Sequence, residues 1–262
     1  SKPRRDTLYA NALEALVLAS PDDDEAKVFY SVALLGLNQG VRDVPTYMRA
    51  GAIAEDVLRR NPEHPGAAHF VIHAFDDPVH APLGLFAARE YSRIAVGAHH
   101  AQHMTTHIFL AMGMWEETVL QNVIASGPDT AAWRPGHYTA WLDYGLLQKG
   151  KYDEARHILE VTRVNVGSPA IAARVSHLLA MRAHYLIETG RWTDAAAEWP
   201  LDTALATTGP KAMDAYALAV VQLSRGNRPA ADSALARLTQ LAHADQSGDY
   251  AYRSNPQVPS IL

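Results

Sequence analysis

The sequence predicts an all-α repeat protein, and three observations support this prediction. Apolar residues recur at spacings of three and four over long stretches such as residues 24–37 and 176–190, as they do on one face of a helix. No run of alternating Val, Ile and Thr is bounded by a two-residue turn, so strand signals are weak. A short motif centred on glycine returns along the chain at a near-constant interval, which is the signature of a helical repeat.

The repeated motif is seen most clearly at its turn. The four segments that carry it are centred on Gly113, Gly150, Gly190 and Gly226, at steps of 37, 40 and 36 residues. An aromatic residue follows the glycine by two positions at Trp115, Tyr152 and Trp192, and alanine follows it by five positions at Ala155, Ala195 and Ala231. Each glycine is expected to end one helix, and the aromatic and small residues let the next helix pack closely against it.

The ends of the chain carry weaker signals. The acidic stretch "PDDDEAK" at residues 21–27 predicts a helix N-terminus, where negative charge is favourable. Residues 246–262 have no helical period and are expected to form an irregular tail. The chain begins without Met and lacks the apolar core of a signal peptide, so we expect a mature form or a fragment of a longer chain.

Composition limits the functional classes. With 262 residues, 48% of them hydrophobic, the chain can form a water-soluble folded domain, and no apolar run is long enough to span a bilayer. A formal net charge of -5 argues against general binding to nucleic acid or an anionic membrane. There is no cysteine but there are 13 His, so any metal must be held by nitrogen and oxygen ligands.

The glycine-centred motif resembles the tetratricopeptide repeat (TPR) superfamily, with residues 140–160, "AWLDYGLLQKGKYDEARHILE", as the best match. Thr118 and Arg228 depart from the pattern, and the repeats are longer than the usual 34 residues. The resemblance covers roughly residues 25–245. It implies a single domain over residues 1–262, a right-handed α-α superhelix of about six helical hairpins, and a concave groove lined by the first helix of each hairpin.

The TPR numbering places many histidines in that groove. With the turn glycine at position 15, first helices start at 99, 136, 176 and 212, and one step back starts another at Pro65. Positions 2, 5 and 9 of these helices then carry a set of imidazoles and one phenol, namely His69, His73, His100, His103, His107, His137, Tyr144, His177 and His184.

Two H-x-x-x-H pairs predict a metal site. Residues four apart share a helix face, so His69 and His73 form one pair and His103 and His107 another on the adjacent helix. Helices packed 8–10 Å apart let the four imidazoles converge on a transition metal, with Cu, Fe and Zn equally compatible. The residue after the first His is Phe70 or Met104, so neither pair is an H-E-x-x-H protease motif.

Other polar residues have two interpretations each. Asp76 and Asp77 follow His73. They either supply a further metal ligand or accept a hydrogen bond that fixes an imidazole tautomer, or they form a solvated turn. His100, His137, Tyr144, His177 and His184 either bind a substrate or line a groove for a peptide. The functional prediction is a metal-binding solenoid with open coordination, which allows catalysis on a small molecule or metal handling; the alternative is a metal-free scaffold for a peptide or partner protein.

A narrower resemblance covers the histidine motifs themselves. Residues 64–74 and 103–115 resemble a bacterial branch of TPR-containing proteins with H-P-G-A-x-H-x-x-I-H-A and H-M-x-x-H-I-F motifs. Members of that branch are longer at the N-terminus. The resemblance implies a bacterial protein, and it supports the site without assigning a reaction. The sequence leaves the location open between the bacterial cytoplasm and, where an upstream signal has been removed, the periplasm or the exterior of the cell.

Overall fold

The computed structural model describes residues 1–37 and 42–247. These residues contain twelve α-helices and two short 3-10 helices, and no strand occurs among them. The prediction of an all-α fold is confirmed. Residues 248–262 of the predicted tail lie outside the described part of the chain.

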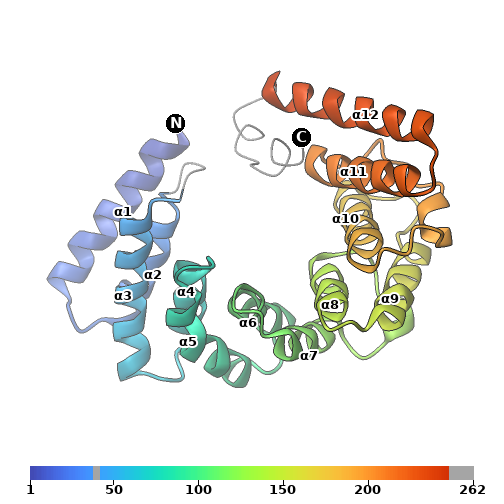
Figure 1. The fold of residues 1–262 in the computed structure, drawn as a ribbon. Helices are drawn as coiled ribbons and strands as arrows, with labels where there is room; N and C mark the ends of the chain where they lie inside the picture. Colours follow the sequence, from blue (N-terminus) through green and yellow to red (C-terminus); the bar gives the residue numbers. More distant parts are fainter. Residues whose placement is uncertain (38–41, 248–262) are drawn as a thin grey trace. The chain divides into compact units, whose positions relative to one another are not determined.

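The chain divides into two compact units, Ser1–Ala125 and Ser126–Leu262. In unit 1 the first six helices pack each against the next, and α2 also contacts α4 as α4 contacts α6, which is the neighbour pattern of stacked helical hairpins (Figure 1). The helices of unit 1 are α1 (Lys2–Ala19), α2 (Asp24–Leu35), α3 (Val44–Arg60), α4 (Pro65–Phe75), α5 (Ala81–Ile94), α6 (His99–Ala111) and α7 (Trp115–Ser126).

Local sequence explains where several of these helices begin. The side chain of Asp23 accepts a hydrogen bond from the Ala26 amide at the start of α2, as predicted from the acidic stretch. Pro65 occupies the first turn of α4, and Nδ1 of His64 accepts a hydrogen bond from the Ala67 amide at 3.3 Å. The predicted helix starts at residues 65 and 99 are therefore correct.

The predicted turn glycines are also confirmed. Gly113, Gly150, Gly190 and Gly226 have φ values of 69°, 70°, 62° and 74°, in the left-handed region that only glycine enters without strain. Each glycine ends the helix before it. Glycine is favoured at this position because a Cβ atom would be strained in the left-handed conformation.

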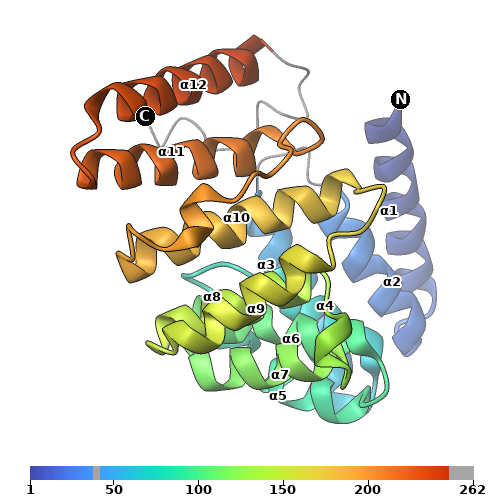
Figure 2. The same cartoon turned by 90° about the vertical axis from the view of Figure 1, so that its right-hand side faces the viewer.

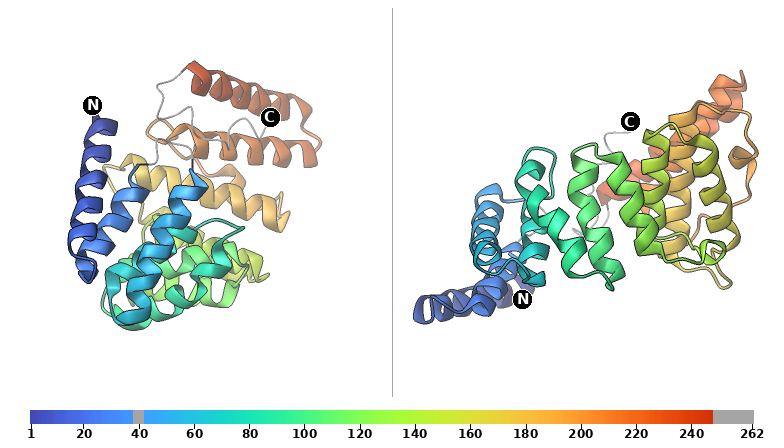
Figure 3. Two further views of the ribbon diagram at one scale, coloured as in Figure 1. Left: turned by 90° about the vertical axis from the view of Figure 1, so that its left-hand side faces the viewer. Right: turned by 90° about the horizontal axis from the view of Figure 1, so that it is seen from below.

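Two close approaches hold the helices of unit 1 together around α4 and α6. A Cβ atom on Gly51 would come within 2.6 Å of the Phe75 ring, so α3 packs closely on the end of α4. A Cβ atom on Gly84 would come within 2.7 Å of Ile108, so α5 packs closely on α6. Figure 3 shows α1 to α6 stacking in chain order. These contacts fix the two helices that carry the H-x-x-x-H pairs.

Unit 2 repeats the stacking pattern (Figure 2). The helices are η1 (Thr130–Ala132), α8 (His137–Gln148), α9 (Tyr152–Val164), α10 (Ala172–Thr189), η2 (Ala195–Glu198), α11 (Thr208–Ser224) and α12 (Arg228–Ser247). The α8 helix contacts α9 and α10, and α10, α11 and α12 pack in succession. The α10 and α11 helices begin four residues before the predicted 176 and 212, because the longer repeats add a turn at their N-termini.

The hairpin expected after Gly190 is incomplete. Instead of a second α-helix, only the 3-10 helix η2 follows, and it ends before Trp199 and Pro200. A proline disfavours helical conformation in the residue before it, so the helix cannot continue. The segment is anchored by Asp194, whose carboxylate accepts hydrogen bonds from Arg156 and from the Tyr185 hydroxyl.

A buried carboxyl group in α8 predicts a pH effect on stability. Asp143 is fully buried, neither of its carboxyl oxygens has a hydrogen-bond partner among the described residues, and burial raises its pKa well above the usual value. Between the unfolded pKa near 3.8 and the raised value, the unfolded chain loses this proton while the folded chain keeps it. Folding stability is therefore lost as the pH rises through this interval.

We expect Asp143→Asn to remove that dependence and to stabilise the fold at pH 8 by about 1 kcal/mol or more. Urea unfolding of the two proteins at pH 5 and pH 8 measures the difference. If their free energies of unfolding changed in parallel between the two pH values, Asp143 would not be the group responsible.

No helix in the described ranges is both long and apolar enough to cross a membrane.

Candidate metal centre

Two neighbouring helices of unit 1 carry the candidate ligands. On α4, His69 and His73 are followed one turn later by Asp76, the residue that ends the helix. On α6, His100, His103 and His107 lie at spacings of three and four and so share one helix face. Because α4 and α6 contact each other, the two sets of side chains meet within unit 1.

The imidazole rings form a continuous series, which we call the histidine row: His100, His69, His73, His107 and His103. The ring centroids of His69 lie 5.3 Å from those of His100 and 4.7 Å from those of His73. His73 is 6.5 Å from His107, and His107 is 5.1 Å from His103. The structure therefore places the four predicted ligands and His100 in one series of neighbouring rings, and their binding of one metal stays a prediction.

Asn122 of α7 fixes the orientation of the His103 ring. Its amide nitrogen donates to the Thr118 carbonyl oxygen at 2.9 Å and to the Thr106 hydroxyl at 3.3 Å. Its amide oxygen is therefore left to accept a hydrogen bond from Nδ1 of His103, at 2.7 Å. The proton is thus on Nδ1, which leaves the lone pair of this buried ring on Nε2.

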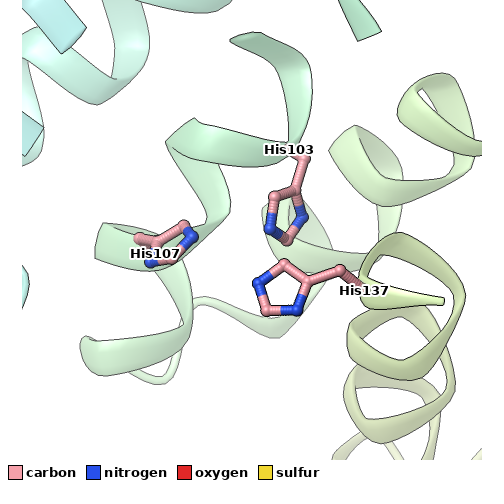
Figure 4. Close-up of side chains that lie close together, drawn as sticks. All are labelled: His103, His107 and His137. Carbon is pink, nitrogen blue, oxygen red and sulfur yellow. The ribbon is translucent and has the colours of Figure 1, made fainter. Parts of the chain in front are cut away.

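Asp76 fixes His107 in the same way. A carboxylate only accepts hydrogen bonds, so Nδ1 of His107 donates to Oδ2 of Asp76 at 2.7 Å. Figure 4 shows His103 and His107 on successive turns of α6, and a ring nitrogen of one lies within 4.8 Å of a ring nitrogen of the other. Histidines that bind metals are commonly held by such a hydrogen bond from their second nitrogen.

The α4 histidines are partly buried. The ring of His69 stacks on Tyr91 at 5.3 Å, and its Nε2 atom is buried with no hydrogen-bond partner among the described residues. Burial, and then the neighbouring His73, His100 and His107, lower the pKa of His69 to about 4. Burial and the proximity of His107 also lower the pKa of His73, and Asp76 opposes this change. Both rings are therefore neutral near pH 7, as metal ligation requires.

Asp77 does not join Asp76 beside the row. Its carboxylate forms an ion pair with Arg42 at 2.9 Å and contacts Nδ1 of His80 at 2.8 Å. Arg42 also donates to the carbonyl oxygens of Ala74 and Asp76. Asp77 thus secures the turn that follows α4, and this turn positions Asp76.

The remaining sequence candidates belong to unit 2 and take part in three ring contacts there. His137, the first residue of α8, lies 5.1 Å from the Trp141 ring and 5.9 Å from His177. Tyr144 lies 5.1 Å from His184. Burial lowers the pKa of His184 and raises that of Tyr144. Their predicted role in binding a substrate stays a prediction.

Two residues of unit 1 were not found from the sequence. Asn122 lies on the second helix of its hairpin, outside the groove positions that the TPR numbering selects, and Tyr91 lies on α5. A helical projection could have placed Asn122 on the face of α7 toward α6. The stacking of Tyr91 on His69 depends on how α5 packs, and no sequence signal indicates it.

Comparison with known proteins shows that the chain is similar in fold to several solved structures. No family model matches the chain, and no curated protein matches it. Solved structures with a similar fold include a human IFIT1 dimer with PPP-AAAA, at 15% identity and a TM-score of 0.47 over 97% of this chain and 63% of that one. Yeast Tom70 is similar at 10% identity and a TM-score of 0.45, over 99% of this chain and 58% of that one. The chain thus spans less than two thirds of the length of these structures.

Proposed function

We propose that the protein binds a transition metal through the histidine row of unit 1, with His69, His73, His103 and His107 as ligands. The observation that carries this proposal is that both α6 histidines are held by a hydrogen bond from Nδ1. Asn122 and Asp76 each accept from Nδ1, so His103 and His107 both present an Nε2 lone pair. A groove built only to hydrogen-bond a peptide has no need for two imidazoles held in the same tautomer.

The donor set determines which metals fit. The row offers neutral imidazoles with one carboxylate beside them, and the chain has no thiolate. Zn, Cu, Fe and Ni accept imidazole nitrogen readily, whereas Ca and Mg prefer oxygen. Three imidazoles on one ion leave a coordination position open for water or a small molecule, as in catalytic zinc sites.

Equilibrium competition against a chelating dye tests the proposal. Unliganded protein is titrated with Zn²⁺ and, separately, with Cu²⁺, and we expect the protein to withdraw metal from the dye at neutral pH. Metal affinity should fall in acid, where protons compete for the imidazoles, and the lowered pKa values of His69 (about 4) and His73 move this loss to a lower pH than for an ordinary histidine. A protein that took no metal from the dye at any pH would act as a metal-free scaffold.

The hydrogen bond between Asp76 and His107 leads to a prediction about metal affinity. We expect Asp76→Asn to lower metal affinity by about 10- to 100-fold, because the neutral amide holds the His107 tautomer less strongly and makes the ring a poorer donor. The adjacent Asp77→Asn is the matched control, since Asp77 pairs with Arg42 and His80 instead. Equal affinity losses in the two variants would show that the effect comes from the turn after α4.

A further inference from the structure

Unit 1 has two grooves that occupy equivalent places between its helices. The α2 helix packs against α1 and α3, and α4 packs against α3 and α5 in the same way. The first groove lies between α1 and α3, and Glu14, Tyr30 and Arg49 are among the residues that line it. The second groove lies between α3 and α5, and its lining includes Glu55, Val71 and Leu83. Because the hairpins repeat, the two grooves can be compared position by position.

Residues with the same spacing line both grooves. One wall carries residues at positions i, i+3 and i+4, which start at Glu14 in the first groove and at Glu55 in the second. The opposite wall carries residues at that same spacing, which start at Arg49 and at Leu83. On the floor, Tyr30 and Val71 are each the seventh residue of their helix. Glu14, Arg49 and Tyr30 therefore correspond to Glu55, Leu83 and Val71.

In the first groove the carboxylate has partners. Nη2 of Arg49 donates a hydrogen bond to Oε1 of Glu14 at 2.6 Å, and the guanidinium lies 5.4 Å from the centre of the Tyr30 ring. Hydrogen bonds from Arg49 and from Tyr30 lower the pKa of Glu14, so the charged form of this carboxylate is favoured. The negative charge on this wall is thus matched by a cation from the opposite wall.

The second groove keeps the carboxylate but has neither partner. Leu83 and Val71 stand where the first groove has an arginine and a tyrosine. Across residues 1–37 and 42–247, Glu55 makes no hydrogen bond or ion pair, and Arg59 pairs with Asp56 at 3.2 Å instead. Burial raises the pKa of Glu55, and Arg59 opposes this rise. The Glu55 carboxylate is therefore partly buried without an ion-pair partner.

The size and lining of the second groove suit one long side chain. The hollow has a volume of about 160 Å³, whereas sites for whole small molecules usually have roughly 300–1,000 Å³. Leu83 and Phe86 are 54% and 60% exposed at its edge, so they offer apolar surface to a partner. Lysine and arginine combine an aliphatic stem with a cationic head, and an aromatic ring such as that of Phe86 also attracts a cation.

We propose that the second groove is a docking site for a partner protein that inserts one lysine or arginine side chain flanked by apolar residues. The cationic head takes the place beside Glu55 that Arg49 occupies beside Glu14, and the aliphatic stem lies against Leu83 and Phe86. None of the proposed metal ligands lines this groove. The inference therefore goes beyond the metal-binding function and does not depend on it.

Fluorescence anisotropy of short dye-labelled peptides, measured with the full chain at physiological salt, tests the proposal. One peptide set has a central lysine between apolar residues, and the matched set has norleucine, which keeps the aliphatic stem and lacks the ammonium group. We expect the best lysine peptide to bind at least about tenfold more tightly than its norleucine counterpart, because its cation meets an unpaired carboxylate.

Three variants locate the site. Glu55→Gln removes the carboxylate, and Leu83→Arg supplies from within the chain the cation that the first groove already has, so each should abolish the preference for lysine. Glu14→Gln makes the same change of net charge in the first groove and should keep the preference. Glu55 is only partly buried and Leu83 is exposed, so the fold should tolerate both changes, and far-UV circular dichroism checks this.

Several results would overturn the proposal. The wild type would have to bind neither peptide set, or to bind both sets equally, or to lose the preference for lysine to the same degree in Glu55→Gln and Glu14→Gln. The last result would indicate general attraction of a cation to a negatively charged chain. Self-association of the wild type in sedimentation experiments, lost in Leu83→Arg, would identify a second copy of the chain as the occupant in place of a separate partner.

Discussion

Replacing His69 and His107 together by alanine is expected to lower metal affinity at least about a thousandfold, which corresponds to roughly 4 kcal/mol. The double variant removes one imidazole from α4 and one from α6, so each helix loses a predicted ligand. His69 contacts two other rings of the row, and His107 joins His73 to His103. A bound ion would be left with too few neutral nitrogen donors to compete with water.

Competition with a chelating dye measures this loss, and His157→Ala controls for removing a histidine from the same chain. His157 is exposed on α9 in unit 2. A double variant that kept wild-type affinity would show that the metal binds elsewhere. Equal losses in the control would indicate non-specific binding to surface histidines.

Breaking the buried ion pair of unit 2 is expected to cost about 3–5 kcal/mol of folding stability. Nε and Nη2 of Arg182 donate to the two carboxylate oxygens of Asp214 at 2.8 and 2.7 Å, and Nη1 donates to the Trp199 carbonyl at 2.9 Å. The side chains are only 3% and 2% exposed. Arg182→Ala therefore leaves a carboxylate buried without its partner, and the cost of that isolated charge dominates the effect.

Urea unfolding of three further variants shows whether burial of the charge is the cause. We expect Asp214→Ala to be similarly destabilising, and Arg182→Met with Asp214→Leu to be far less so, because no charge is then left buried. The exposed pair of Arg228 and Asp232 is the matched control, and Arg228→Ala should change stability by about 0.5 kcal/mol or less. A double variant as unstable as the single ones would contradict this explanation.

Much of the fold could be predicted because its signals are local. A glycine at each turn and apolar residues at helical spacing specify one hairpin at a time, so Gly113, Gly150, Gly190 and Gly226 were all placed correctly. The hairpin after Gly190 is the exception, because Pro200 stops the helix where the repeat predicts one. The division into two units was not predicted, since no change in composition marks Ser126.

The candidate site was predictable only in part. Spacing along one helix placed His69 with His73 and His103 with His107, since residues four apart must share a face. The different roles of Asp76 and Asp77 depend on contacts with α6 and with Arg42 that the sequence does not reveal. The same is true of Asn122, whose hydrogen bond to His103 depends on how α7 packs against α6.

The most direct test of the central claim is the metal content of the wild-type protein. Untagged protein is purified without chelator, incubated with Cu, Fe or Zn salts, freed of loose ions, and examined by elemental mass spectrometry. The metal-binding function predicts at least one tightly held transition metal ion per chain, lost in the His69→Ala and His107→Ala double variant. A metal-free protein after all three incubations would contradict it and leave the histidine row as a binding surface for a peptide or partner protein.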